Sequence, residues 1–163
     1  MLPFIDRIKK RITISQIQTA FRFCCEIGIT TTAFFMIGNP GENEQTMKQT
    51  IRFARDLKAD QVQFKIAVPN PGTELHEIVK REGQLLTTDW SKYVTFGHPV
   101  FELDELTPEL MKRMQRQAYK ELYTRPSYML QRLLRVRSLA ELKGLISGGI
   151  GVIKVISGIG SVD

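Results

Sequence analysis

The segment FFMIGNPGE, residues 34–42, joins a short apolar run to a Gly/Asn/Pro/Gly turn, and a polar stretch with helical spacing follows. This order is typical of a buried parallel strand that leads through a loop into a helix. In α/β folds such loops lie at the carboxyl ends of the strands, where ligands bind. Residues 62–73, VQFKIAVPNPGT, repeat the same order before another helical pattern. The sequence therefore predicts an α/β fold built from βαβ units.

Capping residues and apolar spacing predict the elements around these two segments. The first strand shows no clean alternation of apolar and polar residues, which predicts that both of its faces are covered. The expected order is a helix from the capping box Thr13/Gln16 to Gly28, a strand over 30–37, a helix over 44–57, a strand over 62–68 and a helix from Thr73 to Gly83.

The pattern changes after residue 84, the expected end of the α/β part. Residues 85–106 have no long periodic run, which predicts a loop crossing the end of the sheet, with Trp90, Tyr93, Phe96 and Phe101 as packing residues.

Residues 107–143 form a basic helical region, in which Thr107 and Ser127 are the expected N-caps. Residues 144–163 are rich in Gly and Ile. Because each Gly in a helix interior costs about 1 kcal/mol relative to Ala, an interfacial or disordered tail is expected there instead of a helix. Lys154 and the lack of bulky side chains argue against a transmembrane segment.

The net charge of +6 is concentrated in one segment. Residues 112–143 contain nine Lys and Arg but only two Glu, a net charge of +7, so the rest of the chain is nearly neutral. Such a segment fits a solvated helix face, and it also fits a surface for RNA, anionic lipid or an acidic protein.

Neither the cysteines nor the histidines form a catalytic or metal-binding pattern. Cys24 and Cys25 are neighbours and are predicted to be buried thiols in a reducing compartment. His76 and His98 lie in unrelated contexts and are predicted to be surface residues. No signal peptide is visible, so a cytoplasmic location is expected, with membrane association as a further option.

The turn at residues 38–42 lacks the features of a phosphate-binding loop. It has no GxxxxGK[ST] pattern, and Pro40 removes one backbone N–H donor. Glu42 places a carboxylate at the start of the next helix, which disfavours an anion there. A neutral or cationic ligand fits this loop better, and a tight structural turn without a ligand is the alternative.

The second loop, residues 69–73, is stiffened by two prolines and also leaves few donors. Phe64, Ile66 and Val68 lie on one face of the preceding strand, on which a planar group could lie, although core packing explains such a face more often.

Several segments together resemble the carboxyl-terminal part of the radical S-adenosylmethionine enzymes, and most of all the subfamily with a cobalamin-binding domain. Their order and spacing over residues 8–126 carry the resemblance, and the tail beyond about residue 140 is not covered. The matching pieces are residues 8–10 (IKK), Thr13 and Gln16, 28–30 (GIT), 35–42 (FMIGNPGE), 50–54 (TIRFA), 63–64 (QF), 69–75 (PNPGTEL), 89–93 (DWSKY), 119–123 (YKELY) and 125–126 (RP).

The resemblance implies the last strands of a partial (β/α) TIM-like barrel, followed by an α-helical region. It also implies S-adenosylmethionine, a 4Fe-4S cluster on a CxxxCxxC loop, and cobalamin as cofactors of the complete protein. The CxxxCxxC loop is absent from this chain, so neither a catalytic residue nor a metal ligand is expected in it. The cofactor-contacting residues carried over are Phe35, Met36, Gly38, Asn39, Pro40, Gly41 and Glu42 of the first loop, and Phe64, Val68 and Pro69 of the second strand and its exit.

Two parallel strands cannot close a barrel, and an open edge is a template for pairing with another chain. The chain is therefore expected to be a fragment that needs the missing amino-terminal barrel half, in the same protein or in trans, and to be inactive alone. The complete enzyme would transfer a methyl group to, or rearrange, an unactivated carbon of a small or lipid-like substrate through a 5′-deoxyadenosyl radical. The alternative is a non-catalytic module in which residues 112–143 bind RNA or an anionic membrane.

Overall fold

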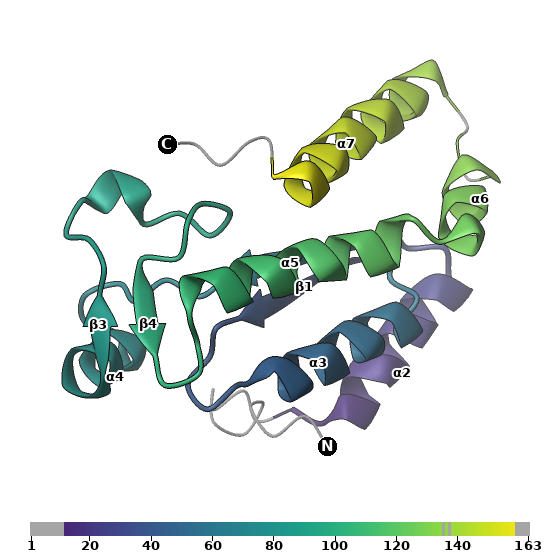
Figure 1. The fold of residues 1–163 in the computed structure, drawn as a ribbon. Coiled ribbons are helices and arrows are strands. Elements are labelled where there is room, and N and C mark those ends of the chain that lie inside the picture. The colour runs from purple at the N-terminus through teal and green to yellow at the C-terminus, as the bar shows by residue number, and fades with distance from the viewer. Residues whose placement is uncertain (1–11, 135, 137, 159–163) are drawn as a thin grey trace.

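The computed structural model describes residues 12–158 except 135 and 137. The predicted match at residues 8–10 and the last five residues of the predicted tail lie outside this part. Figure 1 shows α5 running through the middle of the molecule, with α3 on one side and α7 on the other. The elements are α2 (Ile14–Glu26), β1 (Thr32–Ile37), α3 (Glu44–Asp56), β2 (Gln61–Ile66), α4 (Glu74–Glu82), β3 (Gly83–Leu85), a 3-10 turn (Trp90–Lys92), β4 (Phe101–Leu103), α5 (Pro108–Tyr123), α6 (Pro126–Leu134) and α7 (Leu139–Ser157).

The predicted βαβ unit is present. β1 and β2 pair in parallel, with Phe35 opposite Phe64, and α3 connects them. α3 and α5 pack against this sheet and against each other. The residues at helical spacing on α3, Met47, Ile51 and Ala54, are 1% exposed. The described residues thus form an α/β fold with two small sheets, and no closed barrel is found among them.

The prediction that β1 is covered on both faces is wrong. Ala33 and Ile37 are buried, whereas Phe34 on the opposite face is 62% exposed and Met36 is 44% exposed. The side chains of a strand alternate between the two faces, and α3 and α5 cover one of them. Apolar residues therefore remain on the other face of this strand.

The loop predicted over residues 85–106 is partly a sheet. β3 and β4 pair antiparallel, with Gln84 opposite Glu102. Both strands are only three residues long, too short to show a period in the sequence. Among the aromatics predicted to pack, Phe101 is fully buried, but Trp90 is 62% and Phe96 45% exposed.

The predicted helix caps are largely confirmed. Thr13 and Gln16 form the expected capping box, and Thr73 and Thr107 accept hydrogen bonds at the starts of α4 and α5. Ser127 is not an N-cap, because α6 already begins at Pro126, a residue well suited to a first helical turn.

The tail prediction is wrong for the described residues. Despite its glycines, residues 139–157 form α7, which packs against α5. Val152, Val155 and Ile156 lie against the hydrophobic core. Burial of this apolar face stabilises a helix that glycine propensity alone disfavours, as is usual for helices in proteins. None of the described helices combines the length and apolar character needed to cross a bilayer.

Candidate functional site

The loop after β1 is held by the side chain of Glu42. One carboxylate oxygen, Oε2, accepts hydrogen bonds from the backbone N–H groups of Gly38 (2.8 Å) and Asn39 (3.0 Å). The other oxygen, Oε1, accepts from Asn39 Nδ2 at 3.3 Å, and that amide nitrogen also donates to the Met36 carbonyl at 3.3 Å. The loop therefore contains its own anion, which occupies the N–H groups that would otherwise receive an anionic ligand.

The carboxylate of Glu42 is an internal structural group. The side chain is 4% exposed, and burial raises its pKa above the usual 4.5, while the hydrogen bonds from Asn39 and Gly38 act in the opposite direction. A buried carboxylate costs free energy unless hydrogen bonds satisfy it, and these bonds do so. The prediction that this loop disfavours an anion is consistent with this arrangement.

Gly38 cannot be replaced without strain. Its φ is +95°, a conformation that L-residues rarely adopt. A Cβ at this position would lie 2.7 Å from Sδ of Met111, which is fully buried on α5. The close approach fixes the loop against α5 and sets where the chain leaves the sheet.

The loop after β2 lies beside the first loop, since the two strands are parallel neighbours. The Ala67 N–H donates to the Ile37 carbonyl at 2.8 Å and ties the two strand exits together. Beyond it, Pro69 is buried and its carbonyl oxygen lies 2.9 Å from Nδ1 of His76 on α4. His76, predicted to be a surface residue, is thus half-buried and positions this loop.

The predicted contact residues fall into two groups. Met36 and Gly41 are exposed, and Phe35, Pro40 and Val68 are half-buried, so parts of these residues face the surface. The others are buried in the described part of the chain: Gly38, Asn39, Glu42, Phe64 and Pro69.

Phe64 is a core residue. Its ring stacks on Phe35 with centroids 5.1 Å apart and meets the edge of Tyr119 at 6.4 Å. Since it is 0% exposed, it offers no surface to a planar ligand. The core-packing interpretation of the apolar face of β2 is therefore correct for this residue.

Sequence reasoning missed a cluster on the exposed face of the sheet. Nζ of Lys65 lies 5.0 Å from the ring centroid of Phe34 and 5.9 Å from that of Phe96. Lys65 and Phe34 are the strand neighbours of Phe64 and Phe35 but point to the other face. A consistent period of two across both strands could have identified them, but the continuous apolar run in β1 obscured it.

Metal-ligating groups do not gather anywhere in the described residues. No set of three His, Cys, Asp or Glu side chains is close enough there to hold a metal ion. Cys24 is half-buried and Cys25 is exposed, which corrects the prediction that both are buried.

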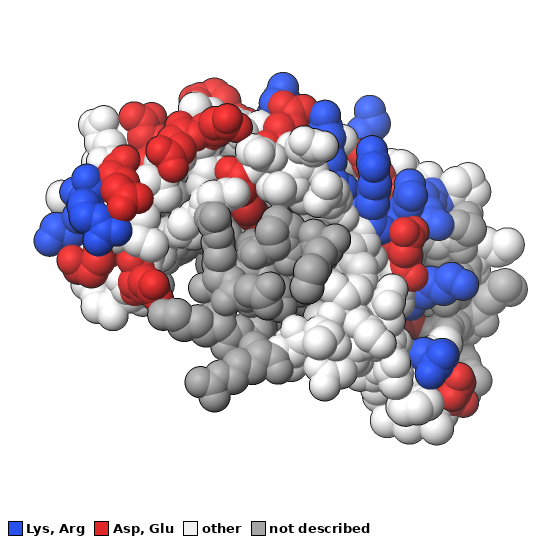
Figure 2. Space-filling model, turned by 90° about the horizontal axis from the view of Figure 1, so that it is seen from below, with Lys and Arg blue, Asp and Glu red and all other residues white. Residues whose placement is uncertain are grey.

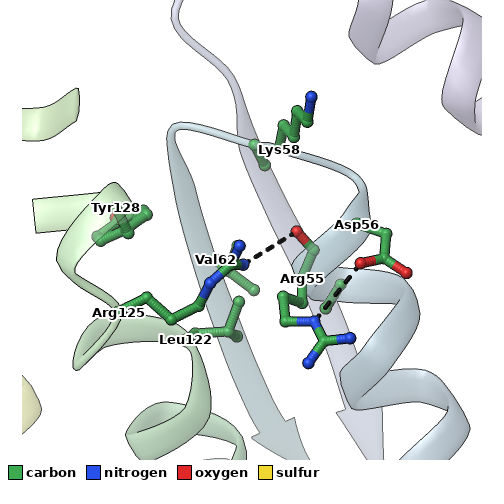
Figure 3. A pocket seen from close by; sticks show the side chains of 9 residues that line it. Arg55, Asp56, Lys58, Val62, Leu122, Arg125 and Tyr128 are labelled. Atoms are coloured by element: carbon green, nitrogen blue, oxygen red, sulfur yellow. Dashed lines mark hydrogen bonds and ion pairs between the residues drawn. The ribbon is translucent and has the colours of Figure 1, made fainter. Parts of the chain in front are cut away.

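A pocket of about 500 Å³ lies at the opposite end of β2, between α3, α5 and α6 (Figure 3). Arg125 Nη1 donates to the Arg55 carbonyl at 3.4 Å, and Arg55 Nε lies 3.5 Å from a carboxylate oxygen of Asp56. Cations at the carboxyl end of a helix offset its dipole, and Arg55 and Arg125 lie at the carboxyl ends of α3 and α5.

The basic segment is only partly a free surface. Arg113 forms a 2.6 Å ion pair with Glu44 on α3. Burial, with a smaller effect from Arg116, lowers the pKa of Lys112. On the face that Figure 2 shows, Lys and Arg predominate on the right and Asp and Glu along the upper left, but both signs of charge occur on each side. These contacts account for two of the cations as parts of the fold.

The chain is similar to parts of larger curated proteins. Over 127 residues, 78% of the chain, it is 36% identical to an uncharacterized methyltransferase of Pyrococcus horikoshii, and the match covers 28% of that protein. Over 111 residues, 68% of the chain, it is 28% identical to an anaerobic magnesium-protoporphyrin IX monomethyl ester cyclase of Rubrivivax gelatinosus, with 20% of that protein covered. Over 119 residues, 73% of the chain, it is 24% identical to a bacteriochlorophyllide d C-8(2)-methyltransferase of Chlorobaculum tepidum, with 26% covered. No family model matches the chain.

The chain spans between one fifth and three tenths of the length of these relatives. Two of the three are named methyltransferases. At this low identity, they support the resemblance to radical S-adenosylmethionine enzymes that the motifs indicate.

Proposed function

We propose that this chain is the cofactor- and substrate-side segment of a radical S-adenosylmethionine enzyme that transfers a methyl group to an unactivated carbon. The observation that carries the proposal is the loop after β1, in which Glu42 fixes the backbone beside the exposed side chain of Met36. The similarity to proteins named as methyltransferases supports the reaction class.

The loop suits part of S-adenosylmethionine. Because Glu42 occupies the N–H groups of Gly38 and Asn39, the loop offers carbonyl oxygens and apolar contacts more readily than donors. The exocyclic amine of adenine and the amino group of the methionine part are hydrogen-bond donors, which such a loop accepts. Exposed Met36 provides a polarizable apolar surface for the adenine ring.

The described residues do not fit the iron–sulfur cluster. Such clusters are held by several Cys thiolates, whereas Cys24 and Cys25 are neighbours on α2 and no larger set is present in this part. We assign the cluster ligands, and the cobalamin that would carry the methyl group, to the part of the complete enzyme outside this chain. The 163-residue chain alone is then inactive, and the substrate of the complete enzyme is a small or lipid-like molecule.

The test uses a fusion in which this chain replaces the matched 127 residues of the Pyrococcus horikoshii relative. Under reducing, anaerobic conditions, the fusion should cleave S-adenosylmethionine, with S-adenosylhomocysteine or 5′-deoxyadenosine as the measured product. Glu42→Ala should lower this cleavage at least tenfold, because it releases the two N–H groups that fix the loop.

Glu44→Gln is the matched control. This carboxylate lies two residues further on, is partly exposed and pairs with Lys48 and Arg113 on the surface. Its replacement should leave cleavage within about twofold, since exposed ion pairs contribute at most about 1 kcal/mol. A folded fusion that binds iron without cleaving S-adenosylmethionine contradicts the proposal.

A further inference from the structure

Helices α3 and α5 pack against only one face of the parallel sheet. The side chains of each strand alternate between the two faces, so every second residue of β1 and β2 points to the other face. On that face the strands pair in register, with Phe34 opposite Gln63 and Met36 opposite Lys65. The uncovered face of the sheet therefore combines exposed apolar side chains with one ammonium group, that of Lys65.

The ammonium group of Lys65 is held by two aromatic rings. Its Nζ lies 5.0 Å from the ring centroid of Phe34 and 5.9 Å from the ring centroid of Phe96. At such distances a cation is attracted to the negative face of an aromatic ring. These contacts keep the long side chain of Lys65 over the uncovered face of the sheet.

The loop that carries Phe96 is itself fixed to the sheet. The Ile66 N–H donates to the Thr95 carbonyl at 2.9 Å, which ties the loop to the end of β2. The Gly97 N–H donates to the Val94 carbonyl at 3.2 Å, and a Cβ on Gly97 would collide with the Val94 side chain. The position of the Phe96 ring is therefore set by a tight turn.

Lys65 has no counterion in the part of the chain that the structure describes. The ion pairs there join other residues, and the contacts of its Nζ are those with the two rings. Phe34 is 62% and Phe96 45% exposed. An apolar molecule that covers these rings also removes water from the ammonium group, and a desolvated charge costs free energy unless an anion pairs with it. A ligand of this face should therefore be apolar and carry an anionic group.

A single cation favours a singly charged anion. Lys65 is the one charged residue on this face of the two described strands, and the other side chains there are Thr32, Phe34, Met36, Gln61 and Gln63. A carboxylate balances one ammonium group, whereas a phosphate monoester carries a charge of about −1.5 to −2. A carboxylate attached to an aromatic or aliphatic body thus fits both the charge and the rings.

We propose that Lys65, Phe34 and Phe96 bind the carboxylate end of an apolar substrate of the complete enzyme. The carboxylate pairs with the ammonium group of Lys65, and the two rings contact the apolar part next to it. Lys65 lies opposite Met36, which we assign to the cofactor, so substrate and cofactor are neighbours on this face. This inference rests on the proposed function for the reaction of the substrate and not for its binding site.

The test measures the binding of two fluorescent probes to the 163-residue chain. They are 1-pyrenebutyrate, which has a carboxylate, and 1-pyrenebutanol, which joins the same apolar body to a neutral hydroxyl group. The wild type should bind the carboxylate about fivefold more tightly, which corresponds to about 1 kcal/mol. Lys65→Met should abolish this preference, whereas Lys65→Arg should keep it because the positive charge remains.

Two further variants separate the local charge from the net charge and from the apolar contact. Lys80→Met removes an exposed ammonium group on α4 and should leave the preference unchanged, although it lowers the net charge of the chain by the same amount. Phe34→Ala should weaken the binding of both probes about threefold, because the ring contacts the apolar body that they share. Circular dichroism checks that each variant keeps the wild-type fold.

Lysine acetylation, followed by mass spectrometry, distinguishes the possible sources of the carboxylate. In the fusion with the Pyrococcus horikoshii relative, saturating 1-pyrenebutyrate should largely abolish acetylation of Lys65 and leave that of Lys80 unchanged. S-adenosylmethionine also carries a carboxylate, and protection of Lys65 by S-adenosylmethionine alone would assign Lys65 to the cofactor and overturn the inference. Protection of Lys65 in the fusion without any addition equally overturns it, because the rest of the enzyme then supplies the partner.

The probe measurements can also overturn the inference by themselves. Equal affinity of the wild type for the two probes would do so, as would a preference that Lys65→Met retains. A fusion that fails to cleave S-adenosylmethionine contradicts the proposed function instead, and probe binding to the 163-residue chain still decides whether Lys65 binds a carboxylate.

Discussion

Gly38→Ala tests how tightly the loop after β1 is fixed against α5. The substitution has two costs. First, Ala must adopt the φ of +95° observed for Gly38, which costs about 1–2 kcal/mol for an L-residue. Second, its Cβ would lie 2.7 Å from Met111 Sδ in a fully buried site, and overpacking of this kind costs about 1–3 kcal/mol. The variant should therefore be about 2–5 kcal/mol less stable than the wild type.

Gly28→Ala is the matched control, because Gly28 also has a positive φ, +77°, but nothing lies within 4 Å of a Cβ there. Gly28→Ala should be only about 1–2 kcal/mol less stable than the wild type, which is the cost of the positive φ for an L-residue. Urea denaturation followed by circular dichroism gives both free energies of unfolding, and unchanged m-values confirm that the same transition is compared.

The difference between the losses of unfolding free energy in the two variants gives the cost of the contact between the added Cβ and Met111. Equal losses would mean that Met111 moves aside without cost and that the loop is not held rigidly against α5. A smaller loss for Gly38→Ala than for Gly28→Ala would refute it outright.

Three further predictions concern protonation and the last helix. Burial raises the pKa of Glu42, so protonation of this side chain favours the folded state. The free energy of unfolding should therefore fall as the pH rises above 4.5, and it should level off above the pKa of the folded state. Glu42→Gln should not show this fall in a pH series of denaturation curves. Burial raises the pKa of Tyr119 to about 12, so the wild type should lose stability between pH 10 and 12, and Tyr119→Phe should lose less stability in this range. At neutral pH, Tyr119→Phe should be about 1–3 kcal/mol less stable than the wild type, because the Phe64 N–H loses its acceptor. Val155→Asp should lower the helical circular dichroism signal, because α7 would no longer pack against the core. Ile153→Asp, at a position 64% exposed, should not lower it. Equal spectra of the two variants would show that α7 forms without this packing.

Local signals predicted the helix starts and the parallel strand pair well. Helix capping and apolar spacing depend on residues that are close in the sequence, so a sequence pattern is enough to predict them. The examples are the N-caps Thr13, Thr73 and Thr107 and the apolar residues of α3. The parallel pairing of β1 with β2 followed from the length of the connection between them.

The errors arose where distant contacts decide the structure. Helix α7 forms because Val152 and Val155 reach the core, a contact that the Gly content of the segment does not reveal. The exposure of Phe34 depends on which face of the sheet α3 and α5 cover. For the candidate site, the sequence predicted the loop, but the hydrogen bonds from Gly38 and Asn39 to Glu42 required the structure.

Amide hydrogen exchange of the active fusion, with and without S-adenosylmethionine, tests whether the two strand exits hold the cofactor. The cofactor should slow exchange in residues 36–42 and around residues 65–70, at the exits of the two parallel strands. The pocket at the other end of β2, around residues 54–59, should not respond. Protection confined to that pocket, or no protection in residues 36–42, would mean that the loop after β1 does not hold the cofactor.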